Sequence, residues 1–382
     1  MGLTAAATLA AAAMLGACGG AGQAAKAPTS YTQPSVSTTQ PTTTTTVATT
    51  TTTVPLRVVG VMPADGAKHI AAAAPVTVTY NRAPGSHPQI SPATAGSWVQ
   101  PASDVWQFHP AGYWAPGTVY TVTAATPEAG VTTPATKATF TIAIPSVLAL
   151  QQYLAMLGYL PLRFTPTGGD PNRLATLRAE PASPNQIPRA PLQGQFAWAY
   201  PGVPATLSSL WYPGVAGAMT TGAIMQFEQD NGLAPDGDAG PQVWNALLRA
   251  VATRQTDPNP YNYVTVTESL PETLLVWQDG KVVYQTPVNT GAPGSATPQG
   301  TWPVIYKQDP NLMKGCEPDG SCYQVWVRYA SYFLPSVGDA IHAYPRYSYG
   351  YPQSNGCVEV DPSQGATVYG YDPVGTLVTV AG

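Results

Sequence analysis

The sequence contains few charged residues: Asp, Glu, Lys and Arg make up 9% of its 382 residues, and Lys and Arg together number 16. Because the net charge is −4, we expect neither a basic nucleic-acid-binding surface nor a polybasic membrane patch. Pro and Gly, in contrast, number 41 and 36, which is well above ordinary usage. This composition argues against a coiled coil, a helical solenoid and a polytopic membrane protein, and it indicates small β-rich domains with many turns.

Long apolar runs are also scarce, and the longest lies at the N-terminus. Residues 3–17 read LTAAATLAAAAMLGA, and Cys18 follows. This run is too short to span a bilayer but suits the apolar core of a signal peptide. The small residues before Cys18 resemble the lipobox of bacterial lipoproteins, although no Lys or Arg precedes the run.

We therefore expect residues 1–18 to be a lipoprotein signal, with Cys18 lipidated and the protein anchored on the outer face of the cell membrane, in the cell wall. The alternative is an ordinary secretory peptide with an incidental cysteine. Residues 19–55 are rich in Thr, and 37–53 hold almost nothing but Thr, Ser, Val, Gln and Pro. Such a segment buries too little apolar surface to fold, so we predict a disordered linker.

Residues 56–145 show the two-residue alternation of β-strands. The alternating runs are 76–80, 105–108, 119–123 and 138–142, and turn-forming residues separate them. Runs with this spacing predict a β-sandwich, and the segments PADGA and APGTVYTVTA resemble bacterial Ig-like domains. The histidines of this part, His69, His87 and His109, are expected in turns or on the surface.

Residues 146–254 change to helical periodicity. Helices are expected from 147 to Gly158, from 222 to 232, and from Pro241 onward. The text resembles the three-helix peptidoglycan-binding domain, split by an insertion at 161–219. The alternative is a purely structural helical domain. Asp236 and Asp238 weakly suggest a calcium loop, but the acidic residues that such loops carry at later positions are missing.

Residues 261–382 return to β-character, with strand-like runs at 263–267, 273–277, 281–291 and 375–380 and a hairpin turn at Asp279-Gly280. The chain as a whole is therefore predicted to be multidomain and mainly β.

The sequence has four cysteines, and export would place them in an oxidising compartment. Cys316 and Cys322 flank a turn-rich loop and are expected to form a disulfide, the alternatives being free thiols or metal binding. Cys357 then has no partner, so it is either buried and inert or a nucleophile.

The surroundings of Cys357 favour the nucleophile. The segment Ser354-Asn355-Gly356-Cys357 follows His342 in the sequence, and an imidazole can accept the proton that a thiol must lose. This pattern resembles the L,D-transpeptidase (YkuD-like) catalytic domain, in which a His precedes a Ser/Thr-His-Gly-Cys motif. A zinc site that uses His342, Cys357 and the cysteine pair is the less favoured alternative, because the spacing of the pair is unlike that of common zinc sites.

Other stretches carry the same resemblance. Thr290-Gly291, the segment from Thr297 to Thr301 and the C-terminal VGTLVTV resemble the corresponding stretches of that family. The sequence also departs from the family in three places. Asn355 stands where the family has His, Glu359 stands where it usually has Asn or Arg, and the loop 343–353 is shorter.

The resemblance implies a cysteine acyltransferase that forms 3→3 cross-links between peptidoglycan stem peptides through a thioester on Cys357, with His342 as acid and base. It implies no cofactor and no metal, and it implies inhibition by carbapenem-type β-lactams. The alternative is a catalytically degenerate lipoprotein that binds and organises the wall.

Supporting roles are predicted for residues near the motif. Gly356 is expected to offer a backbone N–H to the oxyanion, with Ser354 and Asn355 in support. Three tyrosines are weaker candidates for the donor groove: Tyr329, Tyr332 and Tyr344.

Overall fold

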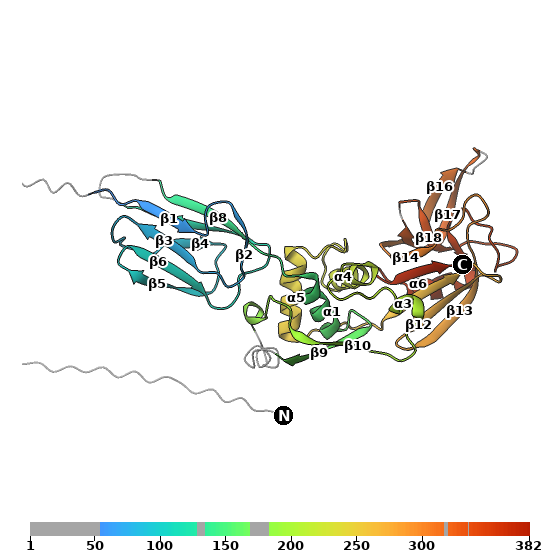
Figure 1. Ribbon diagram of the computed structural model, residues 1–382. Coiled ribbons are helices and arrows are strands. Elements are labelled where there is room, and N and C mark those ends of the chain that lie inside the picture. The colour runs from blue at the N-terminus through green and yellow to red at the C-terminus, as the bar shows by residue number, and fades with distance from the viewer. Residues whose placement is uncertain (1–53, 128–133, 169–182, 317–319, 335) are drawn as a thin grey trace, which may run out of the picture. The chain divides into compact units, whose positions relative to one another are not determined.

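The computed structural model describes residues 54–127, 134–168, 183–316, 320–334 and 336–382 (Figure 1). The chain divides into two units, Met1–Thr53 and Val54–Gly382, and the predicted signal, Cys18 and nearly all of the predicted linker lie outside the described residues. None of the described helices is both long and apolar enough to cross a membrane.

The first described part is a β-sandwich of two four-stranded sheets with the orders β1-β3-β6-β5 and β2-β8-β7-β4. The first sheet consists of β1 (Val58–Met62), β3 (Val76–Tyr80), β6 (Val105–Pro110) and β5 (Gly96–Ala102). The second consists of β2 (Ala67–Ile70), β8 (Thr136–Ile142), β7 (Val119–Ala124) and β4 (Gln89–Ser91).

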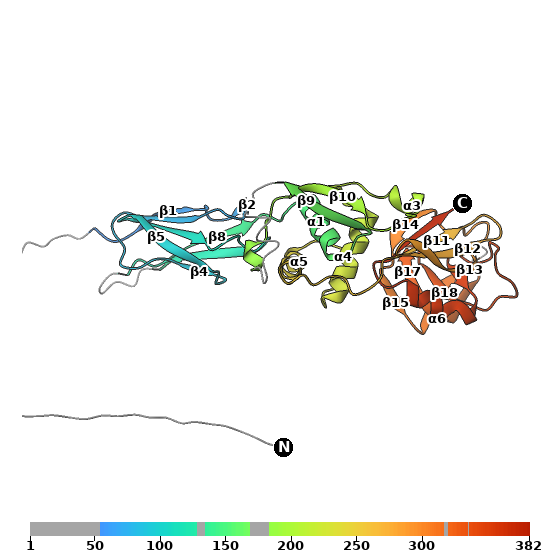
Figure 2. The ribbon, with the colours of Figure 1, turned by 90° about the horizontal axis from the view of Figure 1, so that it is seen from below.

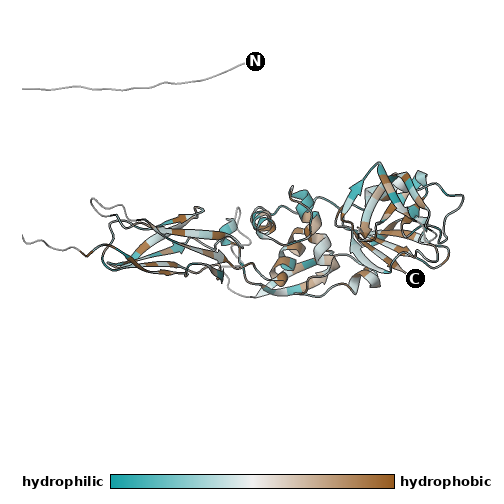
Figure 3. Cartoon of the chain, turned by 90° about the horizontal axis from the view of Figure 1, so that it is seen from above, coloured by the Kyte–Doolittle hydropathy of each residue, from teal (hydrophilic) through white to brown (hydrophobic). Residues whose placement is uncertain are grey.

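Alternation along these strands builds the core between the sheets, as the changing hydropathy along each strand shows (Figure 3). Val76, Val78 and Tyr80 of β3 point inward and are buried, as alternate residues of a half-buried strand must be. Trp114 is fully buried and donates its indole N–H to the carbonyl of Ala74 at 2.7 Å. The predicted sandwich is confirmed, whereas its kinship with Ig-like domains stays a prediction.

The three histidines of the sandwich, His69, His87 and His109, are all exposed, as predicted. His87 stacks on Trp98 with ring centroids 5.6 Å apart. The three histidine side chains therefore lie on the surface of the sandwich.

The second part contains the three predicted helices: α1 (Val147–Leu157), α4 (Ala218–Asp230) and α5 (Pro241–Thr253). Helix α1 begins after Ser146, whose hydroxyl accepts from the Ala149 N–H at 3.4 Å. It ends at Gly158, whose φ of 91° lies in the left-handed region that glycine tolerates best. Proline opens α5, where its missing N–H costs no helical hydrogen bond.

The predicted insertion at 161–219 folds as part of this helical domain. It contains a hairpin of β9 (Leu162–Gly168) and β10 (Gln193–Trp198), the 3₁₀ helix η1 (Pro184–Gln186) and the short α3 (Ala205–Ser208). Phe164 and Phe196 pack across the hairpin with ring centroids 4.9 Å apart. Phe164 belongs to the core that α1, α4 and α5 form and Phe196 packs against it, so the described hairpin strands are part of this domain.

The C-terminal part is built on one large sheet of order β14-β20-β11-β12-β13-β19-β18-β17-β15, with β16 paired to β17. Helix α6 (Pro362–Tyr371) packs against β17 and β18 (Figure 2). The strands are β11 (Asn262–Thr267), β12 (Thr273–Gln278), β13 (Lys281–Asn289), β14 (Gly300–Pro303), β15 (Tyr306–Gln308), β16 (Asn311–Cys316), β17 (Cys322–Leu334), β18 (Asp339–Ala343), β19 (Val358–Val360) and β20 (Leu377–Ala381).

One edge region of this sheet shares its apolar core with the helical domain. Tyr263, Trp277 and Leu377 belong to the core that contains α1, α4 and α5. The Trp277 indole N–H donates to the carbonyl of Gly202 at 3.1 Å, and the Tyr263 hydroxyl donates to Thr206 Oγ1 at 2.9 Å. Packing and hydrogen bonds therefore join the two domains.

A buried carboxyl lies where α4 meets the loop before α5. Glu228 is only 1% exposed, and its Oε2 accepts from the Gly237 N–H at 2.9 Å. Burial raises the pKa of Glu228 to about 7, and the neighbouring acidic Asp236 adds to this effect.

This raised pKa predicts a pH-dependent stability. Because the ordinary glutamate pKa is 4.5, the folded state binds a proton more readily than the unfolded chain. The contribution of Glu228 to stability therefore falls as the pH rises from about 4.5 to about 7. We expect Glu228→Gln, which is neutral at every pH, to raise the midpoint of thermal unfolding relative to the wild type by several degrees at pH 8 and little at pH 5. Asp104→Asn, in the loop between β5 and β6 of the β-sandwich, is the control. An unchanged pH dependence in Glu228→Gln would contradict the assignment.

Candidate active site

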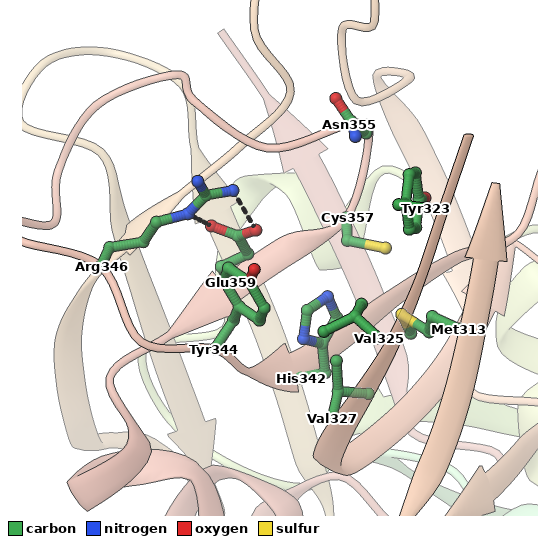
Figure 4. Close-up of a pocket in the computed structure, with 10 residues that line it drawn as sticks. All are labelled: Met313, Tyr323, Val325, Val327, His342, Tyr344, Arg346, Asn355, Cys357 and Glu359. Carbon is green, nitrogen blue, oxygen red and sulfur yellow. Dashed lines mark hydrogen bonds and ion pairs between the residues drawn. The ribbon is translucent and has the colours of Figure 1, made fainter. Parts of the chain in front are cut away.

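His342 and Cys357 line one pocket of about 180 Å³ in the C-terminal domain (Figure 4). The pocket lies between the β16–β17 hairpin and the strands β18 and β19. Its lining residues are Met313, Tyr323, Val325, Val327, His342, Tyr344, Arg346, Asn355, Cys357 and Glu359.

Strand register brings the polar members of this set together. Strands β18 and β19 run parallel, with His342 opposite Glu359. Cys357 precedes Glu359 by two residues, so both side chains leave the sheet on the same face as His342. The alternate residues Ile341, Val358 and Val360 face the other way, into the apolar core of the domain.

The His342 ring is 4% exposed and neutral. Its Nδ1 lies 3.3 Å from the Ala343 carbonyl oxygen, which can only accept, so Nδ1 carries the proton and Nε2 keeps a free lone pair. Burial lowers the pKa of His342. A buried neutral imidazole of this kind can act as a general base.

The Cys357 thiol is also in its neutral form. Burial raises the pKa of Cys357 to about 12; the Ala340 N–H that faces the sulfur opposes this effect, and the charges of Asp339 and Glu359 add to it. The Sγ lies 3.9 Å from the Gly338 carbonyl oxygen, and in Figure 4 it points toward Tyr323 and Met313. Among the described residues no hydrogen bond links Sγ to the His342 ring; Sγ faces the Gly338 carbonyl oxygen and Nδ1 faces the Ala343 carbonyl oxygen.

Ser354 and Gly356 shape the turn that precedes Cys357. The Ser354 hydroxyl donates to the Cys357 carbonyl oxygen and accepts from the Gly356 N–H at 3.3 Å. Gly356 has φ = 110°, and a Cβ there would lie 2.5 Å from Asp339 Oδ1. Only glycine fits this position. The Gly356 N–H, predicted to face an oxyanion, is bonded to Ser354 here, and that predicted role is untested.

The Thr-Gly and Thr-Pro stretches lie beneath this turn. The Thr297 hydroxyl donates to the Gly356 carbonyl oxygen at 2.7 Å and accepts from the Gly291 N–H at 2.9 Å. The Thr290 carbonyl oxygen accepts from the Ser354 N–H at 2.9 Å. Buried Glu272 in turn accepts from the Thr290 N–H and hydroxyl, at 2.6 and 2.7 Å. These segments thus hold the nucleophile turn through hydrogen bonds.

The β16–β17 hairpin forms the wall of the pocket opposite the sheet. The predicted Cys316–Cys322 disulfide is present, with an S–S distance of 2.01 Å, at the end of this hairpin. Both sulfurs are therefore unavailable as zinc ligands. Within the described residues no group of three or more His, Cys, Asp or Glu side chains is placed to hold a metal ion. The sequence analysis did not identify the hairpin's pocket residues, Met313, Tyr323, Val325 and Val327.

The three predicted tyrosines are not placed together. Tyr344 lines the pocket and meets the His342 ring edge to face, with centroids 6.2 Å apart. Tyr329 and Tyr332 lie outside the pocket lining. A register irregularity in β17 and a φ of 60° turn Tyr329 toward Tyr369 of α6, and Tyr332 stacks on Tyr306 at 4.4 Å.

Gly356 offers a direct test of the turn geometry. Gly356→Ala would force its Cβ onto the Asp339 carboxylate in a strained backbone conformation. We expect the alkylation of Cys357 by iodoacetamide to change at least several-fold and the protein to lose about 1–3 kcal/mol of stability. Gly370→Ala, where a Cβ meets nothing within 4 Å, is the control and should leave both unchanged. Wild-type behaviour of Gly356→Ala would show that the turn does not need glycine.

Comparison with known structures gives low overall similarity. An L,D-transpeptidase from Mycobacterium smegmatis is 16% identical, covers 86% of this chain and 99% of its own, and has a TM-score of 0.29. L,D-transpeptidase 3 from Mycobacterium tuberculosis, in complex with a faropenem-derived adduct, is 14% identical, covers 85% of this chain and 98% of its own, and has a TM-score of 0.30. The catalytic domain of an E. faecium L,D-transpeptidase acylated by ertapenem is 28% identical, covers 32% of this chain and 99% of its own, and has a TM-score of 0.29. TM-scores this low do not establish a common arrangement.

Two segments of the chain match protein-family models. Residues 262–380 match the model of the L,D-transpeptidase catalytic domain, and residues 195–247 match that of a putative peptidoglycan binding domain. Among curated proteins, none matches significantly. The second match leaves α1 outside, whereas the first includes all the pocket residues. The predicted mainly β fold class is confirmed, and the chain carries a segment that matches the L,D-transpeptidase catalytic domain, preceded by one that matches a putative peptidoglycan binding domain.

Proposed function

We propose that this protein is a peptidoglycan L,D-transpeptidase that forms 3→3 cross-links through a thioester on Cys357. One observation carries the proposal. The cysteine and the histidine of the motif line the same pocket of a domain that matches the L,D-transpeptidase catalytic family.

The first half-reaction is an acyl transfer to sulfur. As Sγ of Cys357 attacks the carbonyl carbon that follows the L-centre of the donor's diamino acid, Nε2 of His342 takes the thiol proton. The new C–S bond replaces the C–N bond to the terminal D-Ala, which leaves as an amine with the proton from His342. Burial raises the pKa of Cys357 and lowers that of His342, which favours a proton transfer that accompanies the attack.

The second half-reaction regenerates the enzyme. The side-chain amine of an acceptor stem attacks the thioester, His342 accepts the amine proton, and the C–S bond breaks as the new amide forms. The thiol then recovers its proton from His342. The apolar side chains of Met313, Val325 and Val327 on the hairpin limit the water near the thioester and so favour the amine over hydrolysis.

The matched peptidoglycan-binding domain supports the same substrate. Its position in the chain before the catalytic domain fits a role in holding the glycan or stem near the pocket. The E. faecium catalytic domain is described as acylated by ertapenem, and we propose that carbapenems acylate Cys357 here.

A degenerate wall-binding protein is the second candidate. It is favoured by the absence of a hydrogen bond between Cys357 and His342 and by Asn355 in place of the family's histidine. In that case the thiol, with its raised pKa, would have no chemical role.

Acylation by imipenem separates the two candidates. Intact-protein mass spectrometry of the full chain should show one adduct, mapped to the Cys357 peptide, in the wild type and none in Cys357→Ser. His342→Gln should slow adduct formation by about 10²–10⁴-fold, because it removes the general base. Muropeptide analysis with purified tetrapeptide stems should then show 3→3 dimers. Release of D-Ala without dimers would indicate a hydrolase, and a folded wild type that forms no adduct would support the wall-binding protein.

We also propose that the mature protein is exported and held at the outer face of the membrane by lipid on Cys18. This rests on the sequence alone, since Cys18 lies outside the described residues. Cys18→Ser should move the protein from the membrane fraction to the soluble exported fraction, because one lipidated residue supplies the whole anchor. Cys357→Ser is the matched control and should remain with the membrane. Retention of Cys18→Ser in the membrane fraction would contradict a lipid anchor at this residue.

A further inference from the structure

Glu359, which departs from the family pattern, makes a bidentate ion pair with Arg346. Arg346 Nε and Nη2 each lie 2.7 Å from one carboxylate oxygen of Glu359. Glu359 is 4% exposed and lines the pocket beside Cys357. Bidentate geometry of this kind is the strongest form of an arginine–carboxylate pair.

The segment after β18 is folded so that it presents Arg346. Its guanidinium lies 4.8 Å from the centre of the Tyr344 ring. The Arg346 N–H donates to the Tyr349 hydroxyl at 3.0 Å, and that hydroxyl donates to the Tyr344 carbonyl oxygen at 2.6 Å. The ion pair therefore ties this loop to β19, the strand that follows the nucleophile.

A Glu359 carboxylate without its Arg346 partner would destabilise the folded pocket. Burying an unpaired charge is unfavourable, and a negative charge beside Cys357 opposes formation of the thiolate. Besides Arg346, the titratable groups around the thiol and the ring are Asp339, Tyr323 and Tyr344. Arg346 is the only cationic side chain among the described residues that line the pocket.

We propose that Arg346 is a positioning residue, which neutralises Glu359 beside Cys357 and His342 and holds the following loop against β19. The inference rests on the proposed function only insofar as that function uses the Cys357 thiol. It also accounts for the departure at 359, because the positive group that the family can carry at this position comes here from the loop.

The test measures how fast iodoacetamide alkylates Cys357 in the full chain as a function of pH, with the label read on the Cys357 peptide. The variants are Arg346→Met, Glu359→Gln, the double variant and Arg346→Lys. Arg328→Met is the matched control, because Arg328 makes a similar bidentate pair with Asp309 but is 57% exposed and lies outside the pocket. Circular dichroism melting reports on folding, and imipenem acylation is measured in parallel.

Arg346→Met should slow alkylation about 10-fold at each pH from about 7 to 9, because Glu359 is left unpaired beside the thiol. The double variant should recover the rate to within about 3-fold of the wild type, Arg346→Lys should recover part of it, and Arg328→Met should change nothing. If Arg346→Met does not fold, Arg346→Lys and the double variant still make the comparison.

Two results would overturn the inference: an alkylation rate in Arg346→Met equal to that of the wild type at each pH, or a double variant as slow as Arg346→Met. If the alkylation results are as expected but imipenem forms no adduct with the wild type, the proposed function fails while the role of Arg346 stands.

Discussion

The parallel pairing of β18 with β19 is the constraint on which the site depends. It sets His342 opposite Glu359, and the two-residue period of a strand then places Cys357 on the same face. A shift of β19 by one residue against β18 would turn Cys357 and Glu359 toward the apolar core and bring Val358 to the pocket. Two hydrogen bonds hold the nucleophile turn in this register: the Ser354 N–H donates to the Thr290 carbonyl oxygen, and the Thr297 hydroxyl donates to the Gly356 carbonyl oxygen.

The charges of the pocket residues are the second property of the site. The resting pocket contains a protonated thiol, a neutral imidazole and a carboxylate matched by a guanidinium. Such a site has little net charge to repel a peptide.

Local patterns in the sequence predicted the parts of the fold that local forces determine. Alternation predicted strand 76–80, and Ser146 and Gly158 delimit a helix whose apolar spacing is plain in the sequence. The short separation of Cys316 and Cys322 predicted their disulfide, and the motif around Cys357 predicted the pocket polar groups. The hairpin wall was not predictable, because it reaches the pocket through long-range strand pairing. Arg346 was not predicted, because the path of its loop after β18 and its pairing with Glu359 are tertiary features. Tyr329 was named only as a weak candidate for the donor groove; a local irregularity in β17 and a positive φ turn it toward Tyr369, outside the pocket lining.

The shared core of the helical domain and the C-terminal sheet has a consequence for how the chain can be divided. Tyr263, Trp277 and Leu377 are nearly solvent-free because residues of the helical domain cover them. A proteolytic fragment that began at β11 would expose these side chains as an apolar surface prone to association. It would also lack the hydrogen bond from the Trp277 indole N–H to the Gly202 carbonyl oxygen. The two segments that match different families are thus separate in sequence, but we expect them to unfold together as one cooperative unit.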